Sequence, residues 1–189
     1  MSTRPVTAQD ALDQCEKLSP MMVHYCQTKT GLTDPANTIL FYRLGDFYEM
    51  FFEDATLVSK ELELTLTGKD CGMEERAPMC GIPYHAAEGY INRLVENGHK
   101  VAICEQMEDP KQAKGMVKRE VIRVVTPGTT LIPQGLDETK NNYIMSIVCM
   151  EGCFGISTAD ISTGQCLVTE MDKPRRLVDE ITKFMPAEI

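Results

Sequence analysis

The chain is organised around the stretch from Ile39 to Leu66, whose centre, residues 43–51, reads RLGDFYEMF. The apolar segment Ile39 to Leu44 predicts a β-strand, and Gly45 predicts a reversal of the chain. Two aromatic residues and an acid follow, and an amphipathic run begins after them. Apolar residues recur there at the spacing of a helix that buries one stripe: Phe47, Phe51, Ala55, Val58 and Leu62. Spacing alone therefore favours a buried, structural position for Phe47.

Length, composition and charge limit the classes of function. The 189 residues are enough for one large domain or for one domain with part of a second, and an apolar content of 43% allows a hydrophobic core. The net charge of −9 argues against a general nucleic-acid binder, because non-specific affinity comes mainly from Lys and Arg side chains that neutralise phosphates. Any contact with DNA must therefore be local. No apolar run approaches the roughly 18 residues of a membrane span.

The eight cysteines predict neither disulfides nor a metal site. Residues 1–14 contain no apolar signal segment, which favours reduced thiols and a cytoplasmic location. The spacings from Cys71 to Cys80 and from Cys149 to Cys153 contain no C-x-x-C pair, and the three histidines lie in unrelated segments. The sequence predicts no bound metal.

Capping residues and periodicity predict the remaining elements of the first domain. Thr7 is a candidate cap of a first short helix, with Asp10 at the capping-box position. Ser19, Pro20 and Gly31 delimit a second helix. The later predictions are a helix over 51–62, a half-buried strand over 62–67, a rigid turn in place of a regular element over 78–83, a helix over 86–97, and strands over 100–107 and 120–126.

A dense basic segment lies between the last two of these strands. It comprises Lys111, Lys114, Lys118 and Arg119, with Arg123 just beyond. Such a run is usually a solvated loop, because surface Lys and Arg are ordinary. Next to a DNA-binding motif, contact with phosphates becomes the better interpretation.

A polar, proline- and glycine-containing segment over 127–142 predicts a linker between two domains, over 1–126 and 143–189. Three strands over 143–149, 153–160 and 165–169, joined by tight turns, precede a helix that Pro174 opens. The predicted fold class is α/β or α+β, with a mixed β-sheet flanked by helices, followed by a three-stranded meander and a helix. Because so few residues rarely bury a core of their own, this second domain should look unfinished, with an apolar sheet face that is either exposed or covered by another copy of the chain.

The segment LFYRLGDFYEMFFEDA, residues 40–55, closely resembles the start of the mismatch-recognition domain of the MutS family of bacterial DNA mismatch-repair proteins. In that family Phe-x-Glu is the lesion-probing motif. Four further blocks resemble the family in the family's order: SPMM at 19–22, APMCGIPYH at 77–85, VAICEQ at 101–106 and VVTPGT at 124–129. Five ordered blocks make the resemblance specific, whereas Phe-x-Glu alone would occur by chance in many chains.

The resemblance implies a role for particular residues. Phe47 stacks on the mismatched base from the minor-groove side, Glu49 hydrogen-bonds the same base, and the duplex bends. Positions that lie near DNA in the family are occupied here by Leu44, Met79 and Arg119, and Arg119 is a candidate phosphate ligand. Tyr48 is expected to face the core of the domain.

The resemblance also implies partners and the extent of the chain. Residues 143–189 resemble the start of the MutS connector domain, which has a ribonuclease-H-like fold and is incomplete here. Thr67-Gly68-Lys69-Asp70 lacks the upstream glycine and the hydroxyl of a phosphate loop, so ATP and Mg²⁺ are expected only in later domains of the full-length family. The chain therefore looks like an N-terminal fragment without cofactor or enzymatic activity. The expected partners are mismatched double-stranded DNA, MutL and, in the full-length protein, a second copy, at the nucleoid.

Two other functions remain open at this point. Asp160-Ile161-Ser162-Thr163-Gly164 is similar to the first catalytic strand of ribonuclease H, but two-metal chemistry needs several converging carboxylates, and a turn role for Asp160 is favoured. A structural or protein-interaction function would place Phe47 in the core. The solvent exposure of Phe47 discriminates between these interpretations, because a buried Phe47 would rule out the DNA-binding one.

Overall fold

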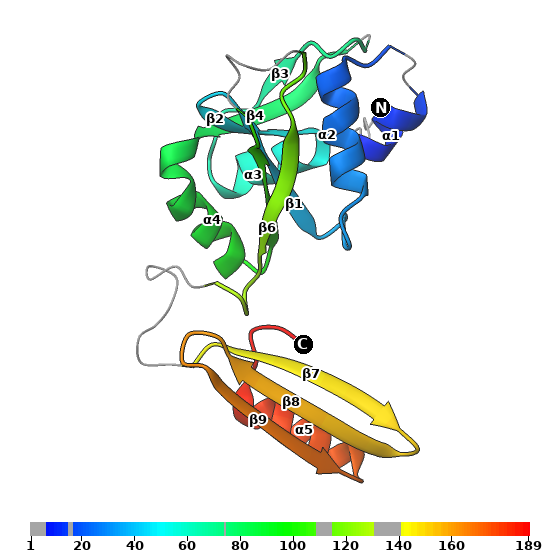
Figure 1. The fold of residues 1–189 in the computed structure, drawn as a ribbon, viewed down its shortest axis with the longest axis vertical. Coiled ribbons are helices and arrows are strands. Elements are labelled where there is room, and N and C mark those ends of the chain that lie inside the picture. The colour runs from blue at the N-terminus through cyan, green and yellow to red at the C-terminus, as the bar shows by residue number, and fades with distance from the viewer. Residues whose placement is uncertain (1–6, 15–16, 74, 109–114, 131–140) are drawn as a thin grey trace. The chain divides into compact units, whose positions relative to one another are not determined.

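The computed structural model describes residues 7–14, 17–73, 75–108, 115–130 and 141–189 (Figure 1). The chain divides into two compact units, residues 1–125 and 126–189. Among the described residues no helix has the length and apolar character needed to span a membrane.

The first unit contains a six-stranded sheet of order β3-β4-β2-β1-β5-β6. Its strands are β1 (Thr38–Leu44), β2 (Phe47–Phe51), β3 (Thr67–Lys69), β4 (Ala77–Pro83), β5 (Lys100–Gln106) and β6 (Arg119–Val125). β1 and β5 pair in parallel, and the other neighbours pair antiparallel. The predicted mixed sheet is confirmed.

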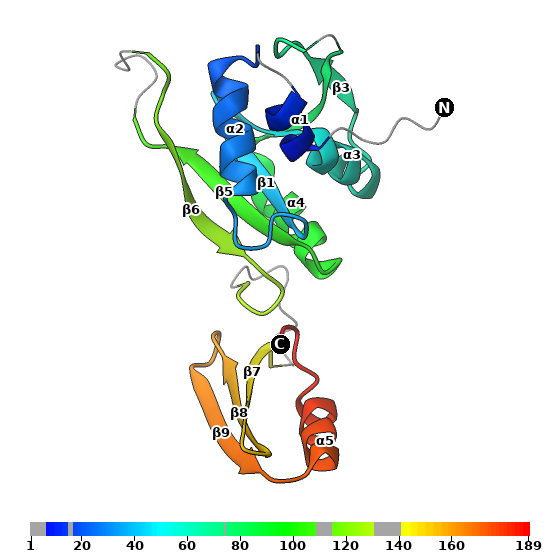
Figure 2. The same cartoon turned by 90° about the vertical axis from the view of Figure 1, so that its right-hand side faces the viewer.

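Helices cover both faces of this sheet. They are α1 (Ala8–Gln14), α2 (Pro20–Thr30), α3 (Phe52–Glu61), the 3-10 turn η1 (Tyr84–Ala86) and α4 (Ala87–Glu96). Figures 1 and 2 show α2 and α4 on opposite sides of the sheet. Thr7 and Asp10 cap α1 reciprocally, and the Ser19 side chain accepts from the backbone N–H of Met22 at the start of α2. The predicted caps of both helices are confirmed.

The prediction that residues 47–51 belong to a helical stripe is wrong, because they form β2 and α3 begins only at Phe52. Leu44 pairs with Phe47 across a two-residue turn. Gly45 has φ 58° and is the one turn residue with positive φ, which is the pattern of a type II′ hairpin. So tight a turn returns the chain directly alongside β1, and the backbone groups of residues 47–51 pair there and with β4.

Two further predictions are wrong. The half-buried strand predicted over 62–67 is a turn and an irregular segment, and only the three residues of β3 pair with the sheet. Residues 78–83, predicted as a rigid turn, belong to β4, which lies between β3 and β2. Its prolines are tolerated because β2 ends opposite Met79, so that Pro78 has no partner on that side, and because Pro83 is the last residue of β4. The predicted α4, β5 and β6 are confirmed.

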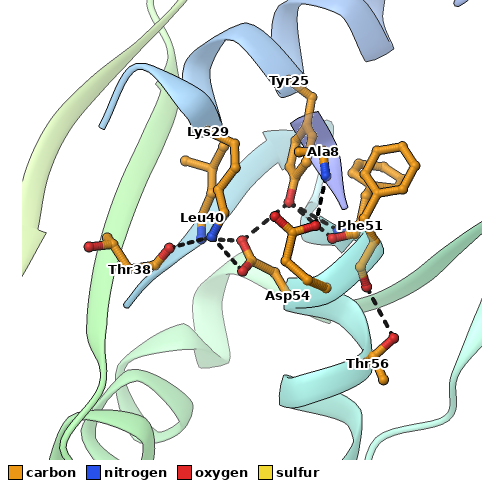
Figure 3. Close-up of polar contacts among 10 residues, drawn as sticks. Ala8, Tyr25, Lys29, Thr38, Leu40, Phe51, Asp54 and Thr56 are labelled. Carbon is orange, nitrogen blue, oxygen red and sulfur yellow. Dashed lines mark hydrogen bonds and ion pairs between the residues drawn. The ribbon is translucent and has the colours of Figure 1, made fainter. Parts of the chain in front are cut away.

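A buried polar network connects α2, α3 and β1 in the core of this unit (Figure 3). The ammonium of Lys29 on α2 donates to Asp54 Oδ1 and to the backbone oxygen of Thr38, both at 2.6 Å. Asp54 Oδ2 accepts from the backbone N–H of Leu40 at 2.8 Å and from the Tyr25 hydroxyl at 3.4 Å. The two charged side chains are only 3% and 4% exposed. Burial raises the pKa of Asp54 to about 6, and the ammonium of Lys29 limits the rise.

The second unit is a meander of β7 (Tyr143–Met150), β8 (Cys153–Asp160) and β9 (Gln165–Met171) with α5 (Pro174–Phe184). α5 covers one face, where Leu177, Ile181 and Phe184 pack on a small core. The predicted meander and helix are confirmed. Apolar side chains that point to the other face are exposed, as the sequence predicted: Val148, Met150 and Val168.

The network around Asp54 gives a first prediction. Lys29→Met leaves the Asp54 carboxylate buried without its counter-charge, so the free energy of unfolding should fall by about 3–5 kcal/mol at pH 8. The loss should be smaller at pH 5, because a lone buried Asp54 takes up a proton and becomes neutral. Urea denaturation followed by circular dichroism measures both values.

Two variants control this measurement. Lys29→Met/Asp54→Asn removes both charges and keeps an amide oxygen for the Leu40 N–H, so it should lose less stability than Lys29→Met alone. Lys60→Met on the exposed side of α3 should change stability by less than about 0.5 kcal/mol. A Lys29→Met variant as stable as Lys60→Met would contradict the importance of the pair.

Candidate nucleic-acid interface

Phe47 is 46% exposed and stands directly after the hairpin turn. Its strand neighbours are Leu44 on β1 and Pro83 on β4. The interpretation of Phe47 as a core residue is therefore wrong, and the DNA-binding interpretation passes the test set by its exposure. A large aromatic ring at the tip of a short hairpin is a suitable shape for insertion into a groove.

Glu49 lies two residues along β2, so its side chain leaves the same face of the sheet as that of Phe47. Its Oε2 lies 2.6 Å from the ammonium of Lys69 on β3. Gly81 is directly opposite on β4, and a Cβ there would lie 3.5 Å from Glu49 Cγ and 3.3 Å from the backbone oxygen of Tyr48. A larger residue at position 81 would therefore crowd the backbone of Tyr48 and the side chain of Glu49.

Arg43 braces the hairpin that carries Phe47. Its Nε donates to the backbone oxygen of Gly45 at 2.6 Å, and its guanidinium lies 3.7 Å from the ring centroid of Tyr84. Nη1 donates to Glu105 on β5 at 3.3 Å, and Glu105 also accepts from the Tyr48 hydroxyl. No role for Arg43 was predicted from the sequence, although the residue lies two positions before Gly45 within the resemblance block.

Tyr84 is a second exposed aromatic residue near Phe47. It is 44% exposed, and it follows Pro83, the strand partner of Phe47. Its backbone N–H donates to the oxygen of Asp46 in the hairpin turn at 3.0 Å. The hairpin tip, Arg43 and Tyr84 therefore form one connected surface.

Two of the remaining sequence-predicted residues lie near this surface. Leu44 and Met79 are partly buried and pack against the core beneath α1 and α2. Leu44 pairs with Phe47, and Met79 pairs with Phe51, four residues further along β2. Tyr48 is buried and packs against Phe41, as predicted.

The placement of Arg119 corrects the prediction that it is a phosphate ligand. The residue is only 7% exposed, and its Nε and Nη1 donate to the backbone oxygens of Arg43 and Val117 at 2.8 and 2.9 Å. Its guanidinium also lies 5.2 Å from the ring centroid of Tyr42. A group that binds phosphate must reach solvent, whereas this one joins β6 to β1.

The structure describes only part of the predicted basic segment. Lys111 and Lys114 lie outside the described residues. Lys118 is exposed, but its ammonium lies 2.7 Å from Glu120 and is partly neutralised by it. Arg123 is exposed on β6.

The predicted turn role of Asp160 is supported by its contacts in the second unit. Its Oδ1 accepts from the backbone N–H groups of Ser162 and Thr163 and from the Ser162 hydroxyl, and its Oδ2 accepts from the N–H of Asn142. The Ser162 hydroxyl and these N–H groups hold the pKa of Asp160 below its ordinary value. Within the described ranges, no cluster of three or more His, Cys, Asp or Glu side chains could hold a metal ion.

Comparison with known proteins gives matches to two family models and to full-length relatives. Residues 19–133 match the model of MutS domain I, and residues 142–189 match that of MutS domain II. The chain is 65% identical over 173 residues to the DNA mismatch repair protein MutS of Lachnoclostridium phytofermentans, which covers 92% of the chain and 18% of the relative. It is 57% identical over 175 residues to the DNA mismatch repair protein MutS of Acetivibrio thermocellus, and this alignment covers 91% of the chain and 20% of the relative. The chain thus spans about a fifth of the length of these relatives.

The contacts of Arg43 give a prediction about the hairpin. Arg43→Met removes two hydrogen bonds and the stack on Tyr84, so the free energy of unfolding should fall by about 2 kcal/mol in urea denaturation. Arg43→Lys should retain only part of this stability, because an ammonium group lacks the planar set of N–H donors of a guanidinium. Arg93→Met, on the exposed side of α4, removes only a long 3.4 Å bond to the backbone oxygen of Glu61, so as the matched control it should lose less than about 0.5 kcal/mol. Equal losses in the three variants would show that Arg43 does not brace the hairpin.

Proposed function

We propose, from the premise that this chain belongs to the MutS family of DNA mismatch repair proteins, that its first unit recognises mispaired or unpaired bases in duplex DNA through Phe47 and Glu49. We assign recognition to residues 1–126, a linker to 127–142 and the start of the connector to 143–189. The observation that carries the proposal is the exposed Phe47 ring on a braced two-residue hairpin.

Deformability is the property of a mismatch that such a surface can read. The hydrogen-bond code of the minor groove is degenerate, and any base can be the wrong one. A mispaired base is easier to unstack than a paired one, by an amount on the order of a few kcal/mol. A rigid aromatic wedge that forces a kink therefore binds a mismatch better than a matched step.

The rigidity of the hairpin supports this role. A hairpin that moved aside when the ring met the base pairs would not separate the stacked bases. The Gly45 turn, the Arg43 bond to its backbone oxygen and the bond from Tyr84 N–H to Asp46 fix the tip from three sides. Phe47 therefore enters the groove with little conformational freedom left to lose.

Glu49 makes the recognition selective. Its carboxylate lies on the face of the sheet that carries Phe47, and it can accept a hydrogen bond from a base displaced by the wedge. Its charge also repels the phosphates of every duplex. Only a deformable site offers the hydrogen bond that offsets this repulsion, so Glu49 mainly lowers the affinity for matched DNA.

The same family membership suggests the wider setting. We propose that the chain acts with MutL and within a homodimer in the bacterial cytoplasm, and that ATP with Mg²⁺ binds domains other than I and II. The net charge of −9 fits weak non-specific binding by this chain, so affinities are best measured at low ionic strength.

Replacing the wedge should remove discrimination. Phe47→Ala loses a base–aromatic stack, so the affinity for a G·T-mismatched duplex should fall about tenfold, toward the matched value, in fluorescence anisotropy titrations. Matched affinity comes from phosphate contacts and should change by less than about twofold. Phe47→Trp keeps an aromatic face and should retain discrimination. An unchanged preference for G·T in Phe47→Ala would exclude the wedge.

Replacing Glu49 should change binding to the matched duplex more than binding to the mismatched one. Glu49→Gln keeps the shape and an amide oxygen but removes the charge, so matched DNA should bind about three- to fivefold more tightly at low salt. The G·T affinity should change less, and the gain on matched DNA should shrink as salt is raised. Equal weakening of both duplexes would mean that Glu49 is a structural residue.

A further inference from the structure

Lys69 is bound to Glu49 in a half-buried ion pair. The side chains are 33% and 19% exposed, whereas those of the Lys118–Glu120 pair are 69% and 50% exposed. Partial burial lowers the local dielectric and strengthens such a pair relative to a fully solvated one. The Lys69–Glu49 pair is therefore more persistent than an ordinary surface contact.

The ammonium of Lys69 is itself held in place by a fixed part of the core. It lies 5.4 Å from the ring centroid of Phe51, which is fully buried. The Phe51 ring in turn packs edge-on against Tyr25, with centroids 4.8 Å apart. Because β3 ends at Lys69, its side chain extends from the last paired position of that strand.

Lys69 contacts only one of the two carboxylate oxygens. Its bond goes to Oε2, and within the described part of the chain no donor is hydrogen-bonded to Oε1. The carboxylate is thus held at one oxygen while the other is available to accept a hydrogen bond. A side chain held in this way loses less rotamer freedom when it binds a ligand.

We propose that Lys69 is a positioning residue for base recognition: it orients the Glu49 carboxylate through Oε2, leaves Oε1 to accept from a displaced base, and offsets the charge of the acid beside the phosphates. This inference rests on the proposed function and adds to it a residue on a different strand. Glu49 alone would be a mobile anion next to DNA. Paired with Lys69, it is an oriented acceptor whose repulsion is reduced until a base is close.

The effects of Lys69 and Glu49 on binding should be coupled. Without Lys69 the unmasked carboxylate should weaken binding to every duplex, and the loss of orientation should weaken mismatch binding further. In a Glu49→Gln background, Lys69 has no carboxylate to orient. Lys69→Met should then act only through the lost positive charge, equally on both duplexes.

A double-mutant cycle in the 189-residue chain tests this, with Lys69→Met, Glu49→Gln and their combination. The first readout needs no DNA: the losses of stability in urea denaturation should be non-additive. The second is anisotropy with G·T-mismatched and matched duplexes at two salt concentrations. Lys69→Met should lower the ratio of mismatched to matched affinity about fivefold when Glu49 is present, and it should leave the ratio unchanged in the Glu49→Gln background.

Two further variants identify the cause. Lys69→Arg keeps the charge and a donor, so it should retain discrimination. Lys100→Met removes an equally charged lysine whose pair with Asp34 is similarly exposed, 34% and 37%, at the opposite end of β1, so it should leave the ratio unchanged. If Lys100→Met lowered the ratio of mismatched to matched affinity as much as Lys69→Met, Lys69 would act only through its charge and not by orienting Glu49.

The outcomes separate this inference from the proposed function. Additive stabilities would show that the ion pair does not form in solution, and an unchanged ratio in Lys69→Met would show that the pair does not orient Glu49. Either result overturns the inference even if Phe47→Ala abolishes discrimination, in which case the proposed function stands. A parent chain that binds both duplexes equally would instead overturn the proposed function.

Discussion

The buried contact between Lys29 and Asp54 is the interaction on which the first unit depends. It joins α2 to the first turn of α3, and its partners reach β1 through Thr38 and Leu40. Two opposite charges this far from water are tolerated because each is bonded on more than one side. The same geometry excludes alternative packings of α2, since a shifted helix would leave a lone charge in the core.

The network extends through Tyr25 to β2, the strand that carries Phe47 and Glu49. The Tyr25 hydroxyl accepts from the backbone N–H of Phe51 at 3.1 Å and so fixes the last residue of β2. Arg43 braces the turn that leads into the other end of the strand. A five-residue strand held at both ends presents Phe47 and Glu49 with a fixed spacing and a common direction. The position of the exposed ring is therefore set both by Arg43 at the turn and by the buried contact of Tyr25 with the other end of its strand.

Electrostatics at this surface are local rather than global. The chain carries a net charge of −9, so a generally positive field does not draw it to DNA. Two ion pairs lie near the hairpin, Lys69 with Glu49 and Arg43 with Glu105. Paired charges contribute little long-range attraction but define positions for hydrogen bonds. Such a surface suits the recognition of a deformed site better than tight binding to any duplex.

The sequence by itself determined both helix caps and the meander with its helix, because these follow from capping chemistry and from local periodicity, and its ordered blocks identified the family. A mixed sheet was predicted as a class, but its parallel pair, β1 with β5, joins segments that meet only in the folded chain. Tertiary structure alone decided that residues 47–51 are a strand: their apolar spacing fits a helix as well, and only pairing with β1 and β4 selects between the two. Tertiary structure also decided that Arg119 is buried and that Lys69 reaches Glu49. The sequence does not distinguish a charged residue that faces water from one that bonds to a carbonyl group. The bonding partners lie on strands that are distant in the chain and come together only when the sheet forms.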